Sequence, residues 1–433
     1  MQGRALPGFR DSYPDDVTLR NRIFATWRSV ARRYGFEEYD GPPLEPLELY
    51  TQKSGEELVQ QLYAFRDKGD REVALRPEMT PTLARMVAAR VQALKKPIRW
   101  FSIPQLFRYE RQQRGRLREH FQLNMDLIGE EGPLADAELL AAGIDVLRAF
   151  GLGPGDVRAR VSDRRVLRTL LVGRGVAEAQ LPVAFAAIDR SEREARGVLE
   201  AKLGERGMGK GERDAVFEIA ALRGLDAVSA ALARVKGGEE AGEPLRACCG
   251  ALAAMGLDAF VEVDLTIVRG LAYYTGIVFE LFDAGRTLRA ICGGGRYDGL
   301  LKALGGVDLP ALGFGMGDVV LGELLAQRGL AAEASSKLDA FLVAVGGDDV
   351  TPVLQLAHEL RDRGLAIEYA LRHQAIRKQL ELAAARGAPR AVIVGPEERA
   401  AGAATVRDLV AGTERRVPLA DLGSALAGGA GNA

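Results

Sequence analysis

Alternating apolar and polar positions divide the chain into segments of different predicted structure. Between Leu19 and Tyr34 the apolar residues recur at helical spacing, and Gly35 follows as a C-terminal cap, so this segment is predicted to be an amphipathic helix. The next segment, Glu37–Glu48, carries three prolines. Because proline cannot donate a hydrogen bond to a sheet, any strand there must be short or lie at an edge or bulge.

From Pro97 to Gly129 the period changes to two. Two short strand-like runs reach Glu110, and after a charged stretch the alternation becomes regular in His120–Leu127. One face of that strand is apolar and the other polar, with Phe121, Leu123, Met125 and Leu127 alternating with His120, Gln122, Asn124 and Asp126. The pattern predicts a strand that packs on one side and faces something polar on the other.

The middle of the chain, about Gly151 to Gly256, is rich in Ala, Leu, Arg and Glu and is predicted to be mostly helical. We interpret it as a helical insertion over about 160–256. Strand signals then return, and they are followed by a glycine turn and a short helix, at Ala259–Ile267, Ile277–Phe282, Leu288–Cys292, Gly293–Gly295 and Tyr297–Leu304.

Small and polar residues at Ala331–Ser336 form the best candidate linker. Beyond it, strands and helices alternate, with predicted strands at Ala340–Val345, Ile367–Leu371 and Ala391–Val394 and predicted helices at Thr351–Arg363 and Ala375–Arg386. Such alternation is typical of an α/β domain with a largely parallel sheet. We therefore expect two domains, 1–330 and 337–433.

Composition excludes several classes of protein. With 47% hydrophobic and 27% charged residues, the chain of 433 residues has the usage of a globular protein rather than a disordered or fibrous one. No apolar run approaches the roughly 20 residues of a membrane-spanning helix, and the start lacks a secretory signal, so a cytoplasmic location is expected. The three cysteines suit neither a disulfide framework nor a metal site.

Charge is balanced overall, with 58 basic and 59 acidic residues, so any nucleic-acid surface must be local. The best candidate is Phe107–Arg118, in which Arg108 and Glu110 share one strand face and a glycine-containing loop follows with four arginines, Arg111, Arg114, Arg116 and Arg118. Guanidinium groups fixed on a sheet suit phosphate binding, and a basic loop suits the end of an RNA. A hairpin with a solvated basic loop is the alternative.

A second candidate is Val268–Glu280, where Arg269 offers a cation to an anion, and Tyr273 and Tyr274 offer hydroxyls to a polar ring. Its alternative is a strand with half-buried tyrosines. The Gly293–Asp298 run lacks the ending of a P-loop. Glu78 follows Arg76 and Pro77. Its carboxylate could bind the amine of a ligand, and the alternative is a turn with a solvated acid.

Taken together, these stretches resemble the histidyl-tRNA synthetases, a family of class II aminoacyl-tRNA synthetases, over nearly the whole chain. The resemblance rests on seven segments. Three resemble the family's motif 1 (Pro43–Glu45), its loop for the substrate amine (Leu75–Thr80) and its motif 2 (Phe107–Gly129). The others resemble its two histidine-specific motifs (Val268–Glu280 and Gly293–Leu300), its motif 3 (Leu312–Gly317) and part of its anticodon-binding domain (His373–Gly395).

The resemblance implies an α+β fold, with an antiparallel-sheet class II catalytic core that carries the helical insertion and a C-terminal α/β anticodon-binding domain. It implies a homodimeric histidine–tRNA ligase that uses ATP with Mg²⁺, L-histidine and histidine tRNA, and no metal site of its own. The alternative is a non-catalytic paralogue, such as the regulatory subunit of ATP phosphoribosyltransferase.

Residue roles also follow from the resemblance. It assigns the ATP α-phosphate to Arg108 and Arg269, and Arg269 also to the histidine carboxylate. The other assignments are to histidine (Glu78, Gln122, Asp126, Tyr273 and Tyr274), to ATP (Glu110 and Arg116) and to the acceptor end of tRNA (Arg111, Gln113 and Arg114).

Four positions depart from the family pattern. Asp126 stands where glutamate is usual, His120–Gln122 reads His-Phe-Gln instead of Phe-His-Gln, and Ala272 replaces an aspartate. The arginine of motif 3, which normally binds the γ-phosphate of ATP, is replaced by Val320. If ATP still binds there, another cation must substitute, and the candidates are Arg114, Arg116 and Arg296.

Overall fold

The computed structural model describes residues 5–51, 59–111, 115–269, 273–331 and 338–427. The chain forms two compact units, residues 1–331 and 332–433. No described helix is long and apolar enough to cross a membrane.

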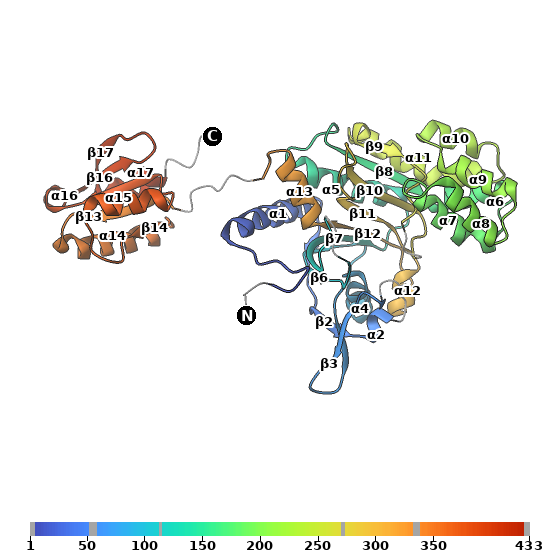
Figure 1. Cartoon of the computed structure of the whole chain (residues 1–433), viewed down its shortest axis with the longest axis horizontal. Coiled ribbons are helices and arrows are strands. Elements are labelled where there is room, and N and C mark those ends of the chain that lie inside the picture. The colour runs from blue at the N-terminus through green and yellow to red at the C-terminus, as the bar shows by residue number, and fades with distance from the viewer. Residues whose placement is uncertain (1–4, 52–58, 112–114, 270–272, 332–337, 428–433) are drawn as a thin grey trace. The chain divides into compact units, whose positions relative to one another are not determined.

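A twisted sheet forms the centre of the first unit (Figure 1). Its neighbouring strands are antiparallel apart from two parallel pairs, β1 with β5 and β8 with β9. In spatial order the strands are β1 (Glu37–Glu38), β5 (Ile98–Ser102), β7 (Glu119–Ile128), β12 (Ala311–Gly317), β11 (Cys292–Arg296), β10 (Ile277–Asp283), β8 (Val157–Asp163) and β9 (Val261–Val263), and β6 (Gln105–Phe107) also pairs with β7. The expected antiparallel catalytic core is therefore confirmed.

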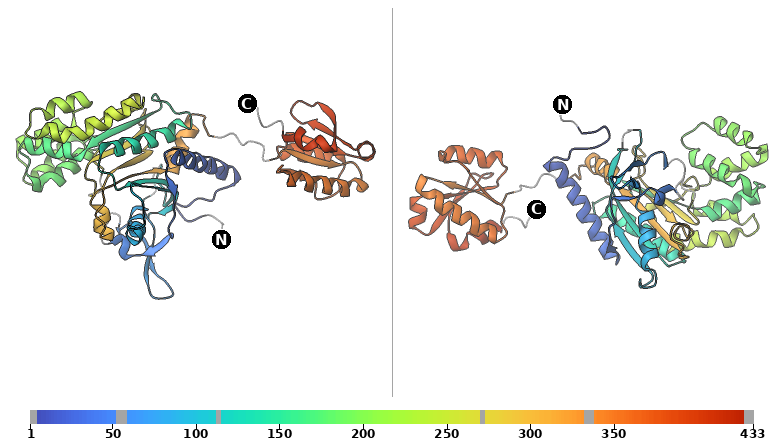
Figure 2. Two further views of the ribbon diagram at one scale, coloured as in Figure 1. Left: turned by 180° about the vertical axis from the view of Figure 1, so that it is seen from behind. Right: turned by 90° about the horizontal axis from the view of Figure 1, so that it is seen from below.

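Helices α1 (Pro14–Arg33), α5 (Pro133–Arg148) and α13 (Asp318–Gln327) pack on one face of this sheet (Figures 1 and 2). Leu123, Met125 and Leu127 of β7 lie in that core, which also contains the fully buried Trp27 of α1. Because side chains alternate along a strand, the polar set of β7 faces the opposite side, as the sequence predicted.

A smaller cluster lies on that opposite side and covers part of it. It contains α4 (Thr80–Arg90) and α12 (Leu300–Gly305). A separate three-stranded sheet has the order β2 (Leu44–Pro46), β4 (Glu72–Leu75) and β3 (Tyr63–Arg66), with α2 (Glu48–Thr51) beside it. The loop after β4 carries Glu78 toward the sheet.

The prediction of a turn at the three glycines was wrong, because Gly293–Gly295 lie inside β11. A Cβ on Gly294 would lie 2.7 Å from Cα of Phe314, and one on Gly295 would lie 2.6 Å from the carbonyl oxygen of Ile277. The strand is glycine-rich because its neighbours approach too closely for side chains.

The helical insertion is present, but it begins after a strand that the sequence reading missed. Strand β8 alternates apolar Val157, Ala159 and Val161 with polar residues and forms part of the central sheet. The helices beyond it gather at the β8–β9 end of the sheet (Figure 1), and they are α6 (Arg164–Gly173), α7 (Leu181–Arg190), α8 (Arg196–Glu205), α9 (Lys210–Ala220), α10 (Leu225–Leu232) and α11 (Gly238–Ala254).

The second unit is a five-stranded sheet with helices. It comprises β13 (Ala340–Ala344), α14 (Val350–Asp362), β14 (Ile367–Tyr369), α15 (Ile376–Ala385), β15 (Arg390–Val394), α16 (Pro396–Ala400), β16 (Ala403–Asp408), β17 (Glu414–Pro418) and α17 (Leu422–Ala427). Strand order is β14-β13-β15-β16-β17. The first three strands are parallel, as predicted, and the last two are antiparallel additions that the sequence reading did not identify.

Candidate active site

Arg108 is the first residue after β6, and its position is set by the loop that contains Glu78. The amide of Phe107 donates to the carbonyl of Arg76 at 3.0 Å, and Nε of Arg108 donates to the carbonyl of Pro77 at 2.9 Å. Burial raises the pKa of Glu78, and the nearby charge of Arg108 opposes that rise. The structure therefore brings these two predicted site residues together.

Arg269 adopts a left-handed backbone conformation with φ of 57°. Such a conformation costs an ordinary residue on the order of 1 kcal/mol, and it is typical of residues held for function. Nη1 of Arg269 lies 3.4 Å from Oε1 of Glu280, and its guanidinium carbon lies 5.5 Å from the ring centroid of Tyr274. Its Nε is buried and has no hydrogen-bond partner among the described residues. A half-buried guanidinium whose buried Nε is an unused donor is suited to an anionic ligand.

Burial acts to lower the pKa of Arg269, but Tyr274, Glu280 and Tyr273 together raise it. Arg269 is therefore a permanent cation.

Glycines on β11 and β12 make room for the polar side chains. A Cβ on Gly293 would fall on the guanidinium of Arg269, 2.6 Å from its Cζ. One on Gly315 would lie 2.6 Å from Cδ of Gln122. One on Gly313 would lie 2.9 Å from Cγ of Asp126. The glycines therefore shape the floor of the site rather than a phosphate-binding turn.

A cavity of about 600 Å³ opens above these strands. Five of the predicted site residues line it, namely Arg108, Glu110, Arg116, Gln122 and Arg269. The lining also includes polar side chains that the sequence reading had not assigned to the site, namely His120, Arg193, Glu280 and Arg289.

The lining of the cavity is strongly positive. Five arginines face two glutamates, and both glutamates are already paired, Glu110 with Arg116 and Glu280 with Arg269. Burial and the neighbouring arginines lower the pKa of His120 to about 3, so its imidazole is neutral at pH 7. A cavity with this surplus of positive charge is suited to a polyanion.

Asp126 belongs to a second polar group beside the cavity. The hydroxyl of Tyr297 donates to Asp126, and the ring of Tyr297 lies 6.0 Å from that of Tyr273, which in turn lies 4.9 Å from that of Tyr274. Burial raises the pKa of Asp126 to about 7, against the hydrogen bond from Tyr297. Such a carboxyl group can hydrogen-bond an uncharged ring in either protonation state.

Several residues named in the sequence analysis are not found in the lining of the cavity. Gln113, Arg114 and Ala272 lie outside the described residues. Arg111 is exposed and does not line the cavity.

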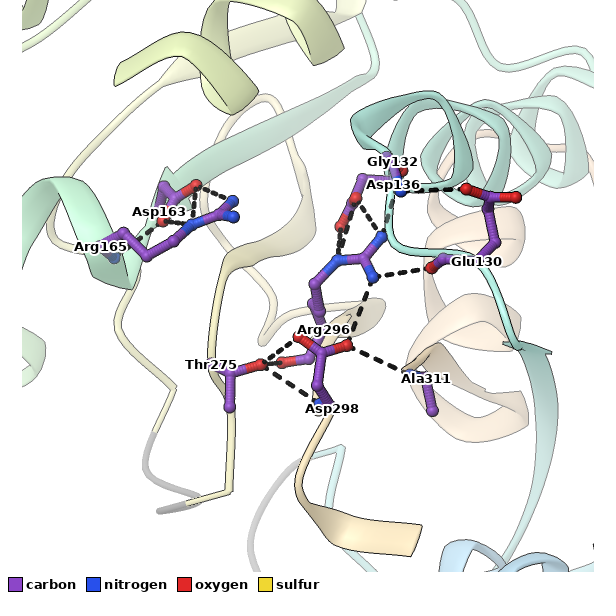
Figure 3. A network of polar contacts seen from close by, with 9 residues as sticks. All are labelled: Glu130, Gly132, Asp136, Asp163, Arg165, Thr275, Arg296, Asp298 and Ala311. Carbon is purple, nitrogen blue, oxygen red and sulfur yellow. Dashed lines mark hydrogen bonds and ion pairs between the residues drawn. The ribbon is translucent and has the colours of Figure 1, made fainter. Parts of the chain in front are cut away.

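Arg296 cannot replace the motif 3 arginine, and that expectation was wrong. Its Nη2 lies 2.6 Å from Oδ2 of Asp136, and its Nη1 donates to the carbonyl of Glu130 at 2.9 Å (Figure 3). Its side chain is only 3% exposed. Arg296 and the neighbouring Arg165–Asp163 pair hold the first unit together rather than facing the cavity (Figure 3).

Two arginines that line the cavity could not be identified as site residues from the sequence. Arg193 follows α7 of the helical insertion, and Arg289 lies in the loop between β10 and β11. Neither stands in a recognisable motif. Tyr297, which hydrogen-bonds Asp126 beside the cavity, does lie in a motif, the glycine-rich Gly293–Leu300 segment.

Comparisons with known proteins agree with this architecture. Residues 8–318 match the family described as histidyl-tRNA synthetase, and residues 339–428 match the anticodon binding domain. A histidine–tRNA ligase of Opitutus terrae is 46% identical over 96% of this chain and 96% of its own. The chloroplastic/mitochondrial histidine–tRNA ligase of Arabidopsis thaliana is 39% identical over 96% of this chain and 85% of its own.

The fold is shared with a solved structure, histidyl-tRNA synthetase from Nostoc sp. PCC 7120, at a TM-score of 0.84 and 24% identity, with 99% of each chain covered. Sequence similarity along almost the full length, both family matches and the shared fold agree with one another. The chain therefore belongs to the histidyl-tRNA synthetase family.

Proposed function

We propose that this chain is a histidine–tRNA ligase and that its reaction takes place in the cavity lined by Arg108 and Arg269. The observation that carries the proposal is Arg269, a strained and half-buried guanidinium with an unpartnered Nε, in one positive cavity with Arg108. The alternative of a non-catalytic paralogue is disfavoured, because relatives 39–46% identical along the chain are ligases.

In the first step a carboxylate oxygen of histidine attacks the α-phosphorus of ATP. The bond from that phosphorus to the bridging oxygen breaks, and pyrophosphate leaves with the electron pair, which yields histidyl-adenylate. No protein base is needed, since the nucleophile is already an anion. The catalytic groups are Arg108 and Arg269, which align the reactants and neutralise charge at the α-phosphate, effects worth several kcal/mol in a water-poor site.

Histidine recognition is assigned to the residues beside the cavity. Asp126 and Tyr274 would face the imidazole ring, with Tyr273 packed against Tyr274. Glu78 and Gln122 would receive the ammonium group. A substrate that cannot pair with these buried polar groups is rejected strongly, since it leaves them without hydrogen bonds.

ATP is assigned to Arg108, Glu110 and Arg116. Mg²⁺ enters as part of the substrate, bound to the phosphates of ATP. Among the described residues no group of three or more His, Cys, Asp or Glu side chains is placed to hold a metal ion by itself. The arginines that line the cavity would bind the polyphosphate.

In the second step a hydroxyl oxygen of the terminal ribose of tRNA attacks the carbonyl carbon of the adenylate. The bond from that carbon to the phosphate oxygen breaks, AMP leaves with the electron pair, and the hydroxyl proton passes to the departing phosphate. The acceptor end is assigned to Arg111, Gln113 and Arg114, and the anticodon to the second unit, which matches the anticodon binding domain. Both assignments rest on the resemblance and on the family match.

We also propose a homodimer that works in the cytoplasm. The dimer is supported by the motif 1 resemblance of Pro43–Glu45, whose Leu44 is 37% exposed. Sedimentation of the purified chain at micromolar concentration would give a mass near twice 46.6 kDa; a sedimentation mass near one chain would contradict it.

The function is tested by exchange of labelled pyrophosphate into ATP, followed by charging of unfractionated tRNA. We expect histidine, and none of the other standard amino acids, to support both reactions. Arg269→Ala should reduce exchange by about 100-fold or more, as losing a group that stabilises transition-state charge does. A purified, folded wild-type chain that exchanges with no amino acid would exclude the enzymatic function.

A further inference from the structure

Val320 leaves one part of the cavity without the cation that this family resemblance leads us to expect. Val320 lies in α13, is 8% exposed and lines the same cavity as Arg108 and Arg269. Its side chain is apolar and cannot pair with a phosphate oxygen. Bound ATP carries most of its negative charge on its two terminal phosphates, and beside the Mg²⁺ that accompanies them we expect a cation of the protein there.

Arg289 stands beside this apolar position. It lines the same cavity, and it comes from the loop between β10 and β11 rather than from α13. A Cβ on Gly115 would lie 3.3 Å from Cγ2 of Val320 and 3.9 Å from Cδ of Arg289, so both side chains flank one point of the cavity wall.

The loop that carries Arg289 is held in place by Asp283. Oδ2 of this buried carboxylate accepts hydrogen bonds from the amide of Thr287 at 2.9 Å and from its hydroxyl at 3.1 Å. Oδ1 accepts from the amide of Leu288 at 2.9 Å. Just beyond, the amide of Ile291 donates to the carbonyl of Leu281 at 2.8 Å. Arg289 therefore starts from a fixed backbone, which reduces the entropy lost when its side chain binds a ligand.

Electrostatics at Arg289 also favour an anion. Burial lowers the pKa of its guanidinium, Arg116 and Arg193 lower it further, and Glu110 opposes them. Like charges gathered at one place are destabilising, and an anion between them relieves the repulsion.

Position distinguishes Arg289 from the other arginines. Leaving out the chain neighbours of Gly115, Arg289 is the one described arginine with an atom within 4 Å of the Cβ built on Gly115, and Arg193 has none there although it lines the same cavity. Arg116 forms an ion pair with Glu110, and Arg296 is buried against Asp136 and does not line the cavity. Arg108 and Arg269 are already assigned to the α-phosphate.

We propose that Arg289 binds the β- and γ-phosphates of ATP and so replaces the arginine that is absent at Val320. This inference rests on the proposed function of the cavity and adds a catalytic residue to it. The pyrophosphate leaving group would then be held from the β10–β11 loop instead of from α13.

The experiment compares binding of ATP and AMP, because AMP has the adenine and the α-phosphate but lacks the two terminal phosphates. Calorimetry with Mg·ATP and with AMP is carried out on the full chain and on Arg289→Gln. We expect ATP affinity to fall roughly 10- to 100-fold, the loss typical of a charge-assisted hydrogen bond, while AMP affinity stays within about twofold.

Arg286→Gln is the matched control, since Arg286 lies in the same loop but pairs with Glu192 outside this cavity. It should bind both nucleotides as the wild type does. In pyrophosphate exchange, Arg289→Gln should raise the KM for ATP and leave the KM for histidine unchanged. The double variant Arg289→Gln/Val320→Arg should recover most of the lost ATP affinity, because it returns a guanidinium to the same wall.

Two results would overturn the inference. Equal losses of ATP and AMP affinity would place Arg289 at the α-phosphate or give it a structural role, and no loss of either would remove it from the site. The calorimetry needs neither histidine nor tRNA, so it tests Arg289 even if exchange fails in the wild type, a failure that would count only against the proposed function.

Discussion

Replacing Gly293 by alanine should disable the cavity without unfolding the sheet around it. The new Cβ would fall on the guanidinium of Arg269, 2.6 Å from Cζ and 3.1 Å from Nη2. Ordinary contact at such a position begins at 3.4 Å. Nη1 lies closer still than Cζ, so the guanidinium must move by at least roughly 1 Å. A displacement of about 1 Å at a reacting centre costs about 100-fold in rate.

Stability should change little in the same variant. The atoms that the new methyl group would meet are at the end of a flexible arginine side chain and not in the backbone. Alanine in a strand also gives the unfolded chain less freedom than glycine, a gain of roughly 0.5–1 kcal/mol. We expect Gly293→Ala to unfold at the wild-type urea concentration, or slightly above it.

The assay is histidine-dependent pyrophosphate exchange, measured beside urea unfolding followed by circular dichroism. Gly317→Ala is the matched control, since Gly317 lines the same cavity and a Cβ there would meet nothing within 4 Å. We expect about a 100-fold loss of exchange for Gly293→Ala, equivalent to roughly 2.7 kcal/mol, and less than a threefold loss for the control. Equal activities in the two variants would refute the reasoning about Arg269.

Two further predictions concern buried charges. Between about pH 4 and pH 7 the unfolded chain loses the proton of Asp126 while the folded chain keeps it, because burial raises its pKa to about 7 from an ordinary 3.8. The free energy of unfolding therefore falls as pH rises through this window. Asp126→Asn should accordingly gain stability relative to wild type between about pH 4 and pH 7 in urea unfolding, and a difference that does not vary with pH would contradict this. Arg296→Met leaves Asp136 buried without its cation and should cost about 3–5 kcal/mol of unfolding free energy, part of which Arg296→Met/Asp136→Leu should restore; an unchanged midpoint for the single variant would count against a structural role.

The spacing of apolar residues along the chain predicted the helices and strands that bury one regular apolar face. Helix α1 and strand β7 were both anticipated, because an apolar stripe at period 3.6 or 2 identifies the side that packs. Strand β8 also alternates, but it stands at the start of a long helical stretch, and the sequence analysis therefore did not separate it from the helices that follow.

Strand β11 shows where glycine was misinterpreted. Three consecutive glycines favour a turn in a sequence read alone, since glycine tolerates unusual dihedral angles. In the structure they lie in a strand because the backbone of β12 and the side chain of Arg269 occupy the space that side chains would need. That reason involves residues distant in sequence, so no local pattern reveals it.

The sequence by itself indicated the family, the division into two units and five of the polar side chains that line the cavity. Three of these, Arg108, Glu110 and Gln122, lie in one short strand–loop–strand segment that a motif identifies. Only the tertiary structure showed that Arg289 lines the cavity and that Arg296 does not. Arg289 and Arg296 are seven positions apart, yet Arg289 lies against the cavity and Arg296 is buried against Asp136, which is 160 positions away. Partners so far apart in the chain meet only when the sheet forms, and whether an arginine binds a substrate or stabilises the core depends on that meeting.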